Sequence, residues 1–394
     1  MRIATSHSLK AGAGEGGGEA VSALVAALGG APDFLVVYAT EHHADPALIK
    51  ALAAGAPGAQ IIGGTSCGGV MTEAGFHTGA DGAIGLLGVC DPDGAYGVGA
   101  APLAASPFAA GAEAIQKALS AAGRDYEAPI LIWCSQPPGC EEQVIDGVQS
   151  IVGPKTPIVG GSSADEAIEG RWRQFSNDGV LADHVVVAAL FPSAPHGAAF
   201  QSGYAPTGDT GVVTRADGRR VLEIDNKPAS EVYSRWTGGE VSAFEAGMIL
   251  AKSTPTPLGR VAARQDSVPM FVLSHPALLG VGGELSLFTD IAEGDHVHLM
   301  RGSPESLVKR AAVVVRDAMA SSSGPGQGSL GALVIYCGGC MLHVRERMDE
   351  VAEQVREAID GSPFLGAFTF GEQGAIIDSC NRHGNLMVSA VTFG

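Results

Sequence analysis

The chain has 394 residues, a formal net charge of −18 and a hydrophobic fraction of 46%, so it is long enough for two or three packed domains and is not globally disordered. The acidic balance argues against binding to nucleic acids or to an anionic membrane surface, because both attract basic side chains. No apolar run approaches the ~18 residues of a membrane-spanning helix. The first residues lack the apolar segment of a secretory signal, and the seven cysteines are an odd number in a long chain. These features predict a cytoplasmic protein in a reducing compartment.

The sequence repeats one order of elements three times. Each copy predicts a short strand, a helix, a strongly apolar strand, a second helix, a strand that ends in glycine-rich sequence, and a last strand. First strands are expected near 3–5, 97–101 and 297–300, first helices over 20–28, 109–121 and 306–319, and last strands over 83–90, 184–191 and 386–393. The central strands carry the aromatic residues Tyr38, Trp133 and Tyr336.

The second helix of each copy is recognised by apolar residues at three- and four-residue spacing. The third copy shows this best, at Val344, Met348, Val351, Val355 and Ile359. Alternating strands and helices predict an α/β fold with much parallel pairing. The continuous apolar strands predict that both sheet faces are covered.

Residues 196–296 do not fit the repeat. Turn sequences at Asp217-Gly218 and Asp225-Asn226 lie between alternating segments and predict a β-rich connector with one short helix. We place a boundary after residue 205, which gives two α/β domains, 1–205 and 206–394, joined by this connector.

Glycine is about twice as frequent as its usual share of roughly 7%, at 56 residues. Much of the excess lies at corresponding strand exits, Gly63-Gly64, Gly160-Gly161 and Gly366, which predicts one architectural feature used three times. Gly12, Gly14 and Gly17 match G-x-G-x-x-G, a weak dinucleotide signal, and we expect a flexible loop over 12–18.

Several motifs follow one another in order over almost the whole chain: GGTSCGGV at 63–70, GGSSAD at 160–165, and further along LVIYCGGCML, GAFTFGEQG and NRHGNLMVSAV. Together they resemble the FIST family (F-box and intracellular signal transduction). Residues 1–205 are similar to a FIST_N region and 206–394 to a FIST_C region. The resemblance implies a non-enzymatic, bacterial sensory protein that binds a small ligand such as an amino acid. It would signal through a partner such as a histidine kinase or a cyclase.

Ligands of open α/β sheets bind outside the carboxyl ends of the strands. Small, hydroxylated and amide-bearing side chains gather there, which suits a polar small molecule and lacks an arranged nucleophile, base and acid. Glu372 stands among glycines, where a carboxylate could pair with an ammonium group. We therefore predict no catalytic residue, no cofactor, and ligand binding by Thr65, Ser66, Cys67, Ser162, Ser163, Asp165, Cys337, Thr369, Glu372, Asn381 and Asn385.

Three alternatives remain. Cys337 and Cys340 form a C-x-x-C after a strand, which could serve redox exchange or, with Cys380 and His383, a zinc site, although two small residues packing a tight turn would look the same. Some FIST relatives resemble haem-containing nitric-oxide sensors, and a haem ligand would come from the scattered histidines His42, His43, His275, His296, His298, His343 and His383. Ser66 lies in a G-x-S-x-G match, the signature of a serine hydrolase, but no amphipathic helix follows it.

Overall fold

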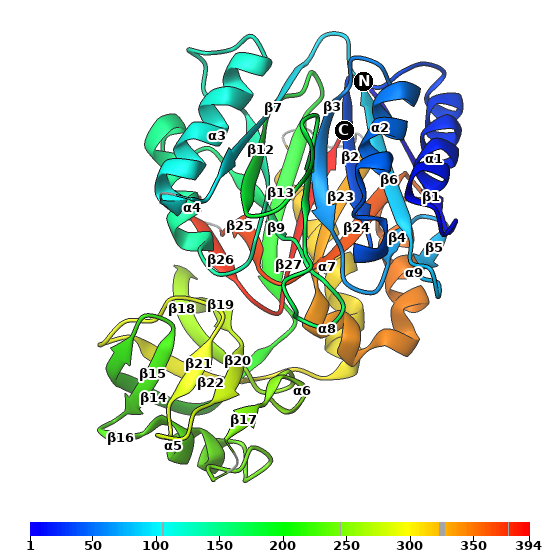
Figure 1. Ribbon diagram of the computed structural model, residues 1–394. Coiled ribbons are helices and arrows are strands. Elements are labelled where there is room, and N and C mark those ends of the chain that lie inside the picture. The colour runs from blue at the N-terminus through cyan, green and yellow to red at the C-terminus, as the bar shows by residue number, and fades with distance from the viewer. Residues whose placement is uncertain (105, 245, 323–327, 377) are drawn as a thin grey trace.

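A computed structural model describes residues 1–104, 106–244, 246–322, 328–376 and 378–394 of the chain. It shows a mixed α/β body of three six-stranded sheets and a separate nine-stranded, β-rich insert. Figure 1 shows the body at the top, with both termini close together, and the insert below it. The predicted α/β class is confirmed.

The first unit follows the predicted order, with an added hairpin. It consists of β1 (Arg2–Ser8), α1 (Ala13–Leu28), β2 (Phe34–Ala39), a 3₁₀ turn (Glu41–His43), α2 (Pro46–Gly55), β3 (Gln60–Thr65), the hairpin β4 (Val70–Thr72) and β5 (Gly75–His77), and β6 (Ile84–Cys90).

The second unit repeats the same order. It consists of β7 (Ala95–Pro102), α3 (Pro107–Ala121), β8 (Leu131–Gln136), α4 (Glu141–Val152), β9 (Ile158–Ser162), the hairpin β10 (Gln174–Ser176) and β11 (Gly179–Leu181), and β12 (His184–Phe191). Ser106 accepts a hydrogen bond from the backbone of Ala109, and Pro107 occupies the first turn of α3, so capping explains where this helix begins.

The third unit is interrupted by the insert. It consists of β13 (His196–Ser202), then after the insert α7 (Pro304–Ser321), β23 (Gly331–Cys337), α8 (Gly338–His343), a 3₁₀ turn (Arg345–Arg347), α9 (Met348–Ala358), β24 (Phe364–Thr369), the hairpin β25 (Glu372–Ala375) and β26 (Asn381–Gly384), and β27 (Met387–Phe393). The apolar spacing from Val344 to Ile359 thus marks a 3₁₀ turn and α9, and a separate short helix, α8, precedes them.

The third unit corrects one predicted strand. The segment expected as its first strand, 297–300, lies in β22 (His296–Arg301), which pairs with β14 and β18 of the insert. The equivalent position belongs to β13, which pairs antiparallel with β27 as β1 pairs with β6 and β7 with β12. The domain boundary predicted after residue 205 therefore separates β13 from the strand that it pairs with.

Each of the three hairpins pairs with a strand of a different unit, and the three pairings together form a closed cycle. β4 of the first unit pairs with β24 of the third, β25 of the third pairs with β9 of the second, and β10 of the second pairs with β3 of the first. Each of the three six-stranded sheets thus contains strands of two units. Parallel pairing among the described strands occurs once in each of the three six-stranded sheets, between β2 and β3, β8 and β9, and β23 and β24. This is less than the alternation of strands and helices predicts.

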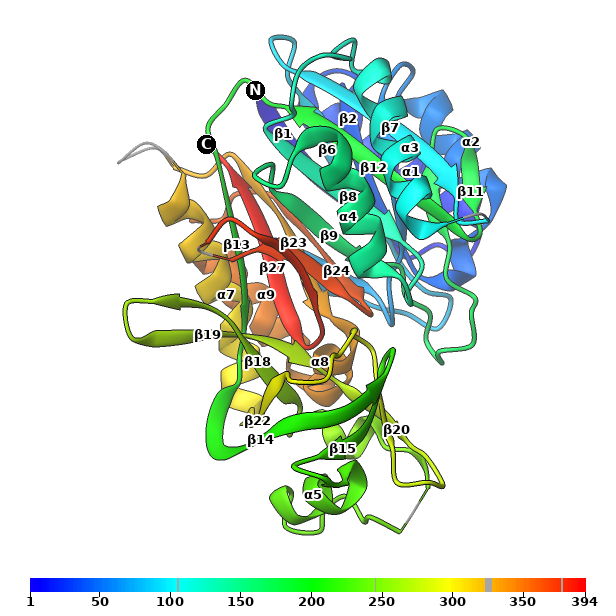
Figure 2. The same ribbon diagram turned by 90° about the vertical axis from the view of Figure 1, so that its left-hand side faces the viewer.

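The central strands are buried on both faces, as their apolar sequences predict. Phe34, Val36 and Tyr38 of β2 join a core shared with Trp133 of β8 and Ile335 of β23. The alternate β2 residues, Leu35, Val37 and Ala39, pack with α1 and α2 on the outside. The period of two therefore directs one face of each sheet to the common centre and the other to its helices. Figure 2 shows helices outside the sheets.

The glycine-rich segment 12–18 is helical instead of the expected loop. Helix α1 begins at Ala13 and packs against α2 and β6. A Cβ atom at Gly16 would lie 2.9 Å from Ile84 Cδ1, and one at Gly17 would lie 2.9 Å from Leu48 Cδ1. These glycines permit close packing of the helix, so the G-x-G-x-x-G match is not a phosphate-binding loop.

The insert has its own hydrophobic core, which includes Tyr233 and Trp236. Its elements are β14 (Ala205–Asp217), β15 (Arg220–Ile224), β16 (Lys227–Pro228), α5 (Ala229–Trp236), β17 (Gly247–Met248), α6 (Leu250–Ser253), β18 (Leu258–Gln265), β19 (Val268–Ser274), β20 (Pro276–Leu279), β21 (Leu285–Leu287) and β22. Both predicted turns are present: Gly218 follows β14, and Asp225 and Asn226 connect β15 to β16 with φ of 53° and 58°. Of the helices described, none is long and apolar enough to cross a membrane.

Candidate ligand-binding site

The exits of the three parallel strand pairs meet in the middle of the body. Three backbone hydrogen bonds join the segments that leave β3, β9 and β24: Cys67 N donates to Phe368 O (3.0 Å), Ala164 N to Thr65 O (2.8 Å) and Phe370 N to Ser162 O (3.1 Å). The structure therefore brings together six of the predicted site residues, Thr65, Ser66, Cys67, Ser162, Ser163 and Thr369.

This junction is packed instead of open. All six side chains are buried, and the hydroxyl groups have partners inside the protein. Ser162 donates to Glu141 Oε1 at 2.8 Å, Ser163 lies 3.2 Å from Ser135 Oγ, and Thr369 donates to Glu372 at 3.0 Å. Because the hydroxyl groups already have partners, the junction holds the three sheets together.

Ser66 illustrates this role. Its Oγ donates to Gly69 O at 2.6 Å and accepts from Phe368 N at 2.8 Å. The chain continues from β3 into strand β4, not into a helix. The sharp strand-to-helix turn that exposes a nucleophilic serine is therefore not formed here.

A cavity of about 410 Å³ lies next to the junction, between the insert and the body. Its walls come from three distant parts of the chain: the loop after β9, the insert around α6, and the third unit around α8. The lining is Glu166, Ala167, Ile168, Leu250, Ala251, Thr254, His275, Phe288, Cys337, Gly339, Leu342, His343, Phe370 and Asn385. Most of these side chains are apolar, with a few polar groups among them, as is typical of small-molecule sites.

His275 and Asn385 connect the insert to the third unit at the cavity wall. The backbone N–H of His275 donates to Asn385 Oδ1 at 3.2 Å, and Asn385 Nδ2 donates to Phe370 O at 3.3 Å. His275 Nε2 lies 3.2 Å from Leu250 O. Burial lowers the pKa of His275 to about 4, so the ring is neutral at pH 7.

Asp165 organises the loop that forms one edge of the cavity. Its carboxylate accepts hydrogen bonds from the backbone N–H groups of Ile168, Glu169 and Arg171. Ile168 has a φ of 57°, an uncommon conformation for a β-branched residue, which these contacts hold in place. Asp165 itself does not line the cavity, so its contribution to a site there would be to position the loop.

Cys337 lines the cavity, and Glu372 lies behind it. The Glu372 carboxyl accepts from Thr369 Oγ1 at 3.0 Å and from Met387 N at 3.1 Å. Burial, with the neighbouring Cys337 thiol, raises the pKa of Glu372 well above its ordinary value of 4.5. A buried neutral acid is a poor partner for an ammonium group, so the geometry does not favour the role expected for Glu372.

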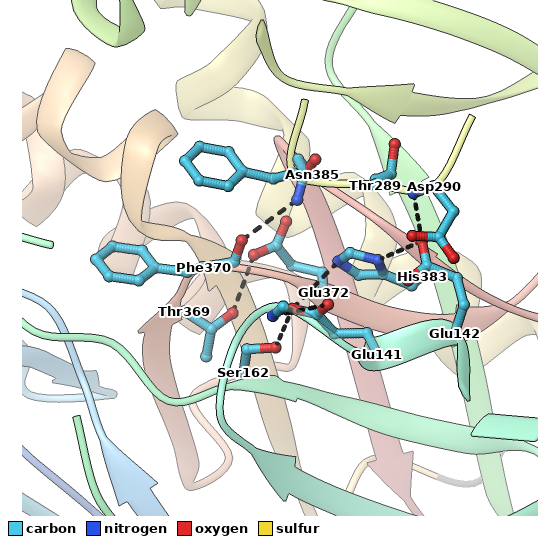
Figure 3. A network of polar contacts seen from close by, with 12 residues as sticks. Glu141, Glu142, Ser162, Thr289, Asp290, Thr369, Phe370, Glu372, His383 and Asn385 are labelled. Carbon is cyan, nitrogen blue, oxygen red and sulfur yellow. Dashed lines mark hydrogen bonds and ion pairs between the residues drawn. The ribbon is translucent and has the colours of Figure 1, made fainter. Parts of the chain in front are cut away.

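A network of charged residues joins the insert to the second and third units. Arg219 Nη2 lies 2.8 Å from Glu141 Oε2 and 2.6 Å from Glu142 Oε2, and His383 Nδ1 lies 3.0 Å from Glu142 Oε1. The backbone of Asp290 also donates to Glu142 at 3.0 Å. Figure 3 shows the contacts of Glu142 with His383 and Asp290. Burial alone would lower the pKa of His383, but Glu141 and Glu142 raise it.

The alternative metal ligands are not gathered in one place. In the described ranges, the metal-ligating side chains that lie within 4.8 Å of one another in a group of three or more are Glu141, Glu142 and His383. Arg219 already pairs with both of these carboxylates. Cys380 is exposed, whereas Cys337 and Cys340 are buried, and burial raises the pKa of the Cys337 thiol. The residues present therefore do not fit a Cys337, Cys340, Cys380 and His383 zinc site.

Asn381 also lies apart from the cavity. Its Oδ1 accepts from Ile158 N at 2.8 Å, and its Nδ2 donates to Thr156 O at 2.9 Å, which fastens β26 to the second unit. Of the predicted ligand-binding residues, only Cys337 and Asn385 line the cavity.

Sequence reasoning missed most of the insert's contribution, namely Leu250, Ala251, Thr254 and Phe288, and named His275 only as one of several scattered histidines that could bind haem. The only signal was His275, which stands within the apolar run FVLSHPALL. A polar residue in such a run indicates a buried site, but nothing local indicates which part of the body faces it.

The fold is that of a mixed α/β protein with a β-rich insert, and the family comparisons cover both parts of it. A model of the FIST N domain matches residues 33–227, and a model of the FIST C domain matches residues 229–375. The chain belongs to the FIST family. FIST domains are sensory domains that bind small ligands. The two matches meet after residue 227, and the boundary predicted from the sequence lies after residue 205.

A comparison with curated proteins finds no match. Among solved structures, the chain is similar to a cyanuric acid hydrolase from A. caulinodans, with 11% sequence identity and a TM-score of 0.37 over 99% of this chain and 98% of that one.

Proposed function

We propose that this protein is a non-enzymatic sensor that binds a small metabolite in the cavity between the insert and the body. The observation that carries the proposal is that the cavity is lined by three different parts of the chain. Residues of the second unit, the insert and the third unit line one space of about 410 Å³. A ligand in that space contacts all three parts at once.

The lining favours a ligand with an apolar portion larger than the sequence analysis expected. Leu250, Phe288, Leu342 and Phe370 provide the apolar surface, and the polar groups are few. An amino-acid-like metabolite with an apolar or aromatic side chain suits this lining, since the apolar portion gains burial and the polar end stays near the rim.

The position of the cavity supports a mechanism of signalling. A ligand that contacts both the insert and the body stabilises the arrangement in which both contacts are made, by an amount set by its differential affinity. A partner protein such as a histidine kinase or a cyclase would respond to the arrangement of insert and body that the ligand stabilises. All seven cysteines are free, which supports a cytoplasmic setting.

A thermal-shift screen of amino acids and related metabolites tests the proposal. A ligand at one hundred times its dissociation constant stabilises the folded state by about 2.7 kcal/mol. We expect a compound that stabilises the wild-type protein to have no effect on Ala251→Trp, in which the new side chain fills the cavity.

The matched control is Ala320→Trp, on α7, which lines a different depression. This variant should respond as the wild type does. Equal stabilisation of the wild type and Ala251→Trp by the same compound would place binding elsewhere and contradict the proposal.

A haem sensor is the second candidate, but the residues fit it less well. His275 Nε2 lies against Leu250 O, and His343, at the end of α8, is exposed. The protein therefore already engages the Nε2 atom of His275, and the ring of His343 is not enclosed, whereas haem iron is held by a free ring nitrogen inside an apolar pocket. Purified protein mixed with haem should show no Soret band of a ligated haem, and such a band that disappears in His343→Ala would favour this candidate.

A further inference from the structure

The polar atoms that line the cavity are not equally available to a ligand. Thr254 donates its hydroxyl to Leu250 O at 2.8 Å, and Asn385 Nδ2 donates to Phe370 O at 3.3 Å. Asn385 Oδ1 already accepts from His275 N. Most hydrogen-bond donors of the wall are therefore engaged by the protein.

The atoms not engaged in this way include two acceptors, besides the exposed ring of His343, which offers both a donor and an acceptor. His275 Nε2 faces Leu250 O, which can only accept, so Nε2 carries the ring proton and Nδ1 is left as an acceptor. Nδ1 has no hydrogen-bond partner among the residues that the structure describes. Glu166, exposed at the edge of the cavity, presents a carboxylate that pairs with no described residue.

The charges around the cavity also favour a cationic ligand. The residues that line the cavity in the described part of the chain include an acid and no lysine or arginine. The whole chain carries a net charge of −18, which attracts cations and repels anions over long distances. A ligand carboxylate would find no permanently charged partner in the cavity, whereas an ammonium group would find Glu166.

We propose that the ligand is an apolar amine, whose ammonium group is bound by Glu166 and whose apolar portion packs against Leu250, Phe288 and Phe370. This inference rests on the proposed function and specifies its ligand class. An amine is favoured over the amino acid from which it differs by a carboxylate, because the carboxylate would lose water without gaining a cationic partner.

Isothermal titration with three matched probes tests the ligand class. The probes are 2-phenylethylamine, the neutral 2-phenylethanol and the anionic 3-phenylpropionate. We expect the full-length protein to bind the amine more tightly than the alcohol, and the acid most weakly.

The variant Glu166→Gln removes the charge and keeps the shape. An exposed charged pair contributes up to about 1 kcal/mol. The substitution should therefore weaken the binding of the amine by about fivefold and leave the affinity for the alcohol unchanged. Glu169→Gln, in the same loop but outside the cavity lining, is the control and should change neither.

Tighter binding of the acid than of the amine, no measurable binding of the amine, or an unchanged amine affinity in Glu166→Gln would overturn the ligand class. The proposed function is judged separately with Ala251→Trp. If the wild type binds 3-phenylpropionate and this variant does not, the cavity is still the binding site and only the assignment of the ligand as an amine is wrong. If it binds all three probes as the wild type does, the proposed function fails as well.

Discussion

Single polar side chains at the strand exits determine how the three sheets hold together. Ser66 is fully buried and makes two backbone hydrogen bonds, and Glu372 is buried beside Cys337. Both were expected to face a ligand, because small polar residues at strand exits are typical of binding sites. The structure shows that the same residue types also satisfy the backbone groups where the exchanged hairpins leave their sheets.

Replacing Ser66 by alanine tests its structural role. The change leaves Gly69 O and Phe368 N without their buried partner, so we expect a loss of about 1–3 kcal/mol in the free energy of unfolding, measured with urea. Ser150→Ala, on the exposed side of α4, should cost much less. A fluorophosphonate probe should not label the wild type, and labelling that disappears in Ser66→Ala would instead support a hydrolase.

The raised pKa of Glu372 predicts that the stability of the protein depends on pH. Its pKa is raised in the folded protein, so the folded state keeps a proton that the unfolded chain releases above about pH 4.5. The contribution to stability is present at low pH and is lost as the pH rises toward the folded-state pKa. Relative to Glu372→Gln, the wild type should lose up to about 1.4 kcal/mol per pH unit in that window, measured by urea unfolding. A constant difference between the two proteins would contradict the buried neutral acid.

At the scale of elements, the positions of the repeated strands and helices could be predicted from the sequence, but the departures from the repeat could not. Apolar strands at 34–39, 131–136 and 331–337 and their following helices could be found from local patterns, because burial on both faces leaves a continuous apolar run. Helix α1 was missed at its start, since glycine has poor helix propensity. Only the tertiary contacts of Gly16 and Gly17 explain why glycines stand in a helix.

Two neighbouring glycines of α1 give opposite predictions. Gly18→Ala adds a Cβ atom with nothing within 4 Å, whereas Gly17→Ala places one 2.9 Å from Leu48 Cδ1. We expect Gly18→Ala to raise the free energy of unfolding by about 0.5–1 kcal/mol through helix propensity, and Gly17→Ala to show no gain or a loss. Equal gains at both positions, measured by thermal and urea unfolding, would show that close packing does not require Gly17.

At the scale of the whole molecule, the exchange of hairpins and the insert decide where the ligand can bind. Neither follows from local sequence, because β4, β10 and β25 pair with strands far away along the chain. β13 likewise pairs with β27 across the entire insert. The sequence therefore indicated the class of fold and the strand exits, but not the cavity, one wall of which comes from the insert.

Arg219 tests the connection between the insert and the body. Arg219→Ala leaves Glu141 and Glu142 without their guanidinium partner, and Glu141 is 1% exposed. We expect a loss of about 2–4 kcal/mol in the free energy of unfolding. The adjacent Arg220, which pairs with Asp217 at the surface, is the control, and its alanine variant should unfold as the wild type does. Equal effects of the two changes would show that the charged network does not hold the insert.

Hydrogen–deuterium exchange, with and without a compound found in the thermal-shift screen, tests whether a ligand binds between the insert and the body, because a bound ligand slows local opening of the segments that it contacts. We expect slower exchange in both α6, residues 250–253 of the insert, and α8, residues 338–343 of the body, with β13 unchanged as an internal control. Protection confined to one side of the cavity, or found at β13 and not at α6 and α8, would contradict binding between the insert and the body.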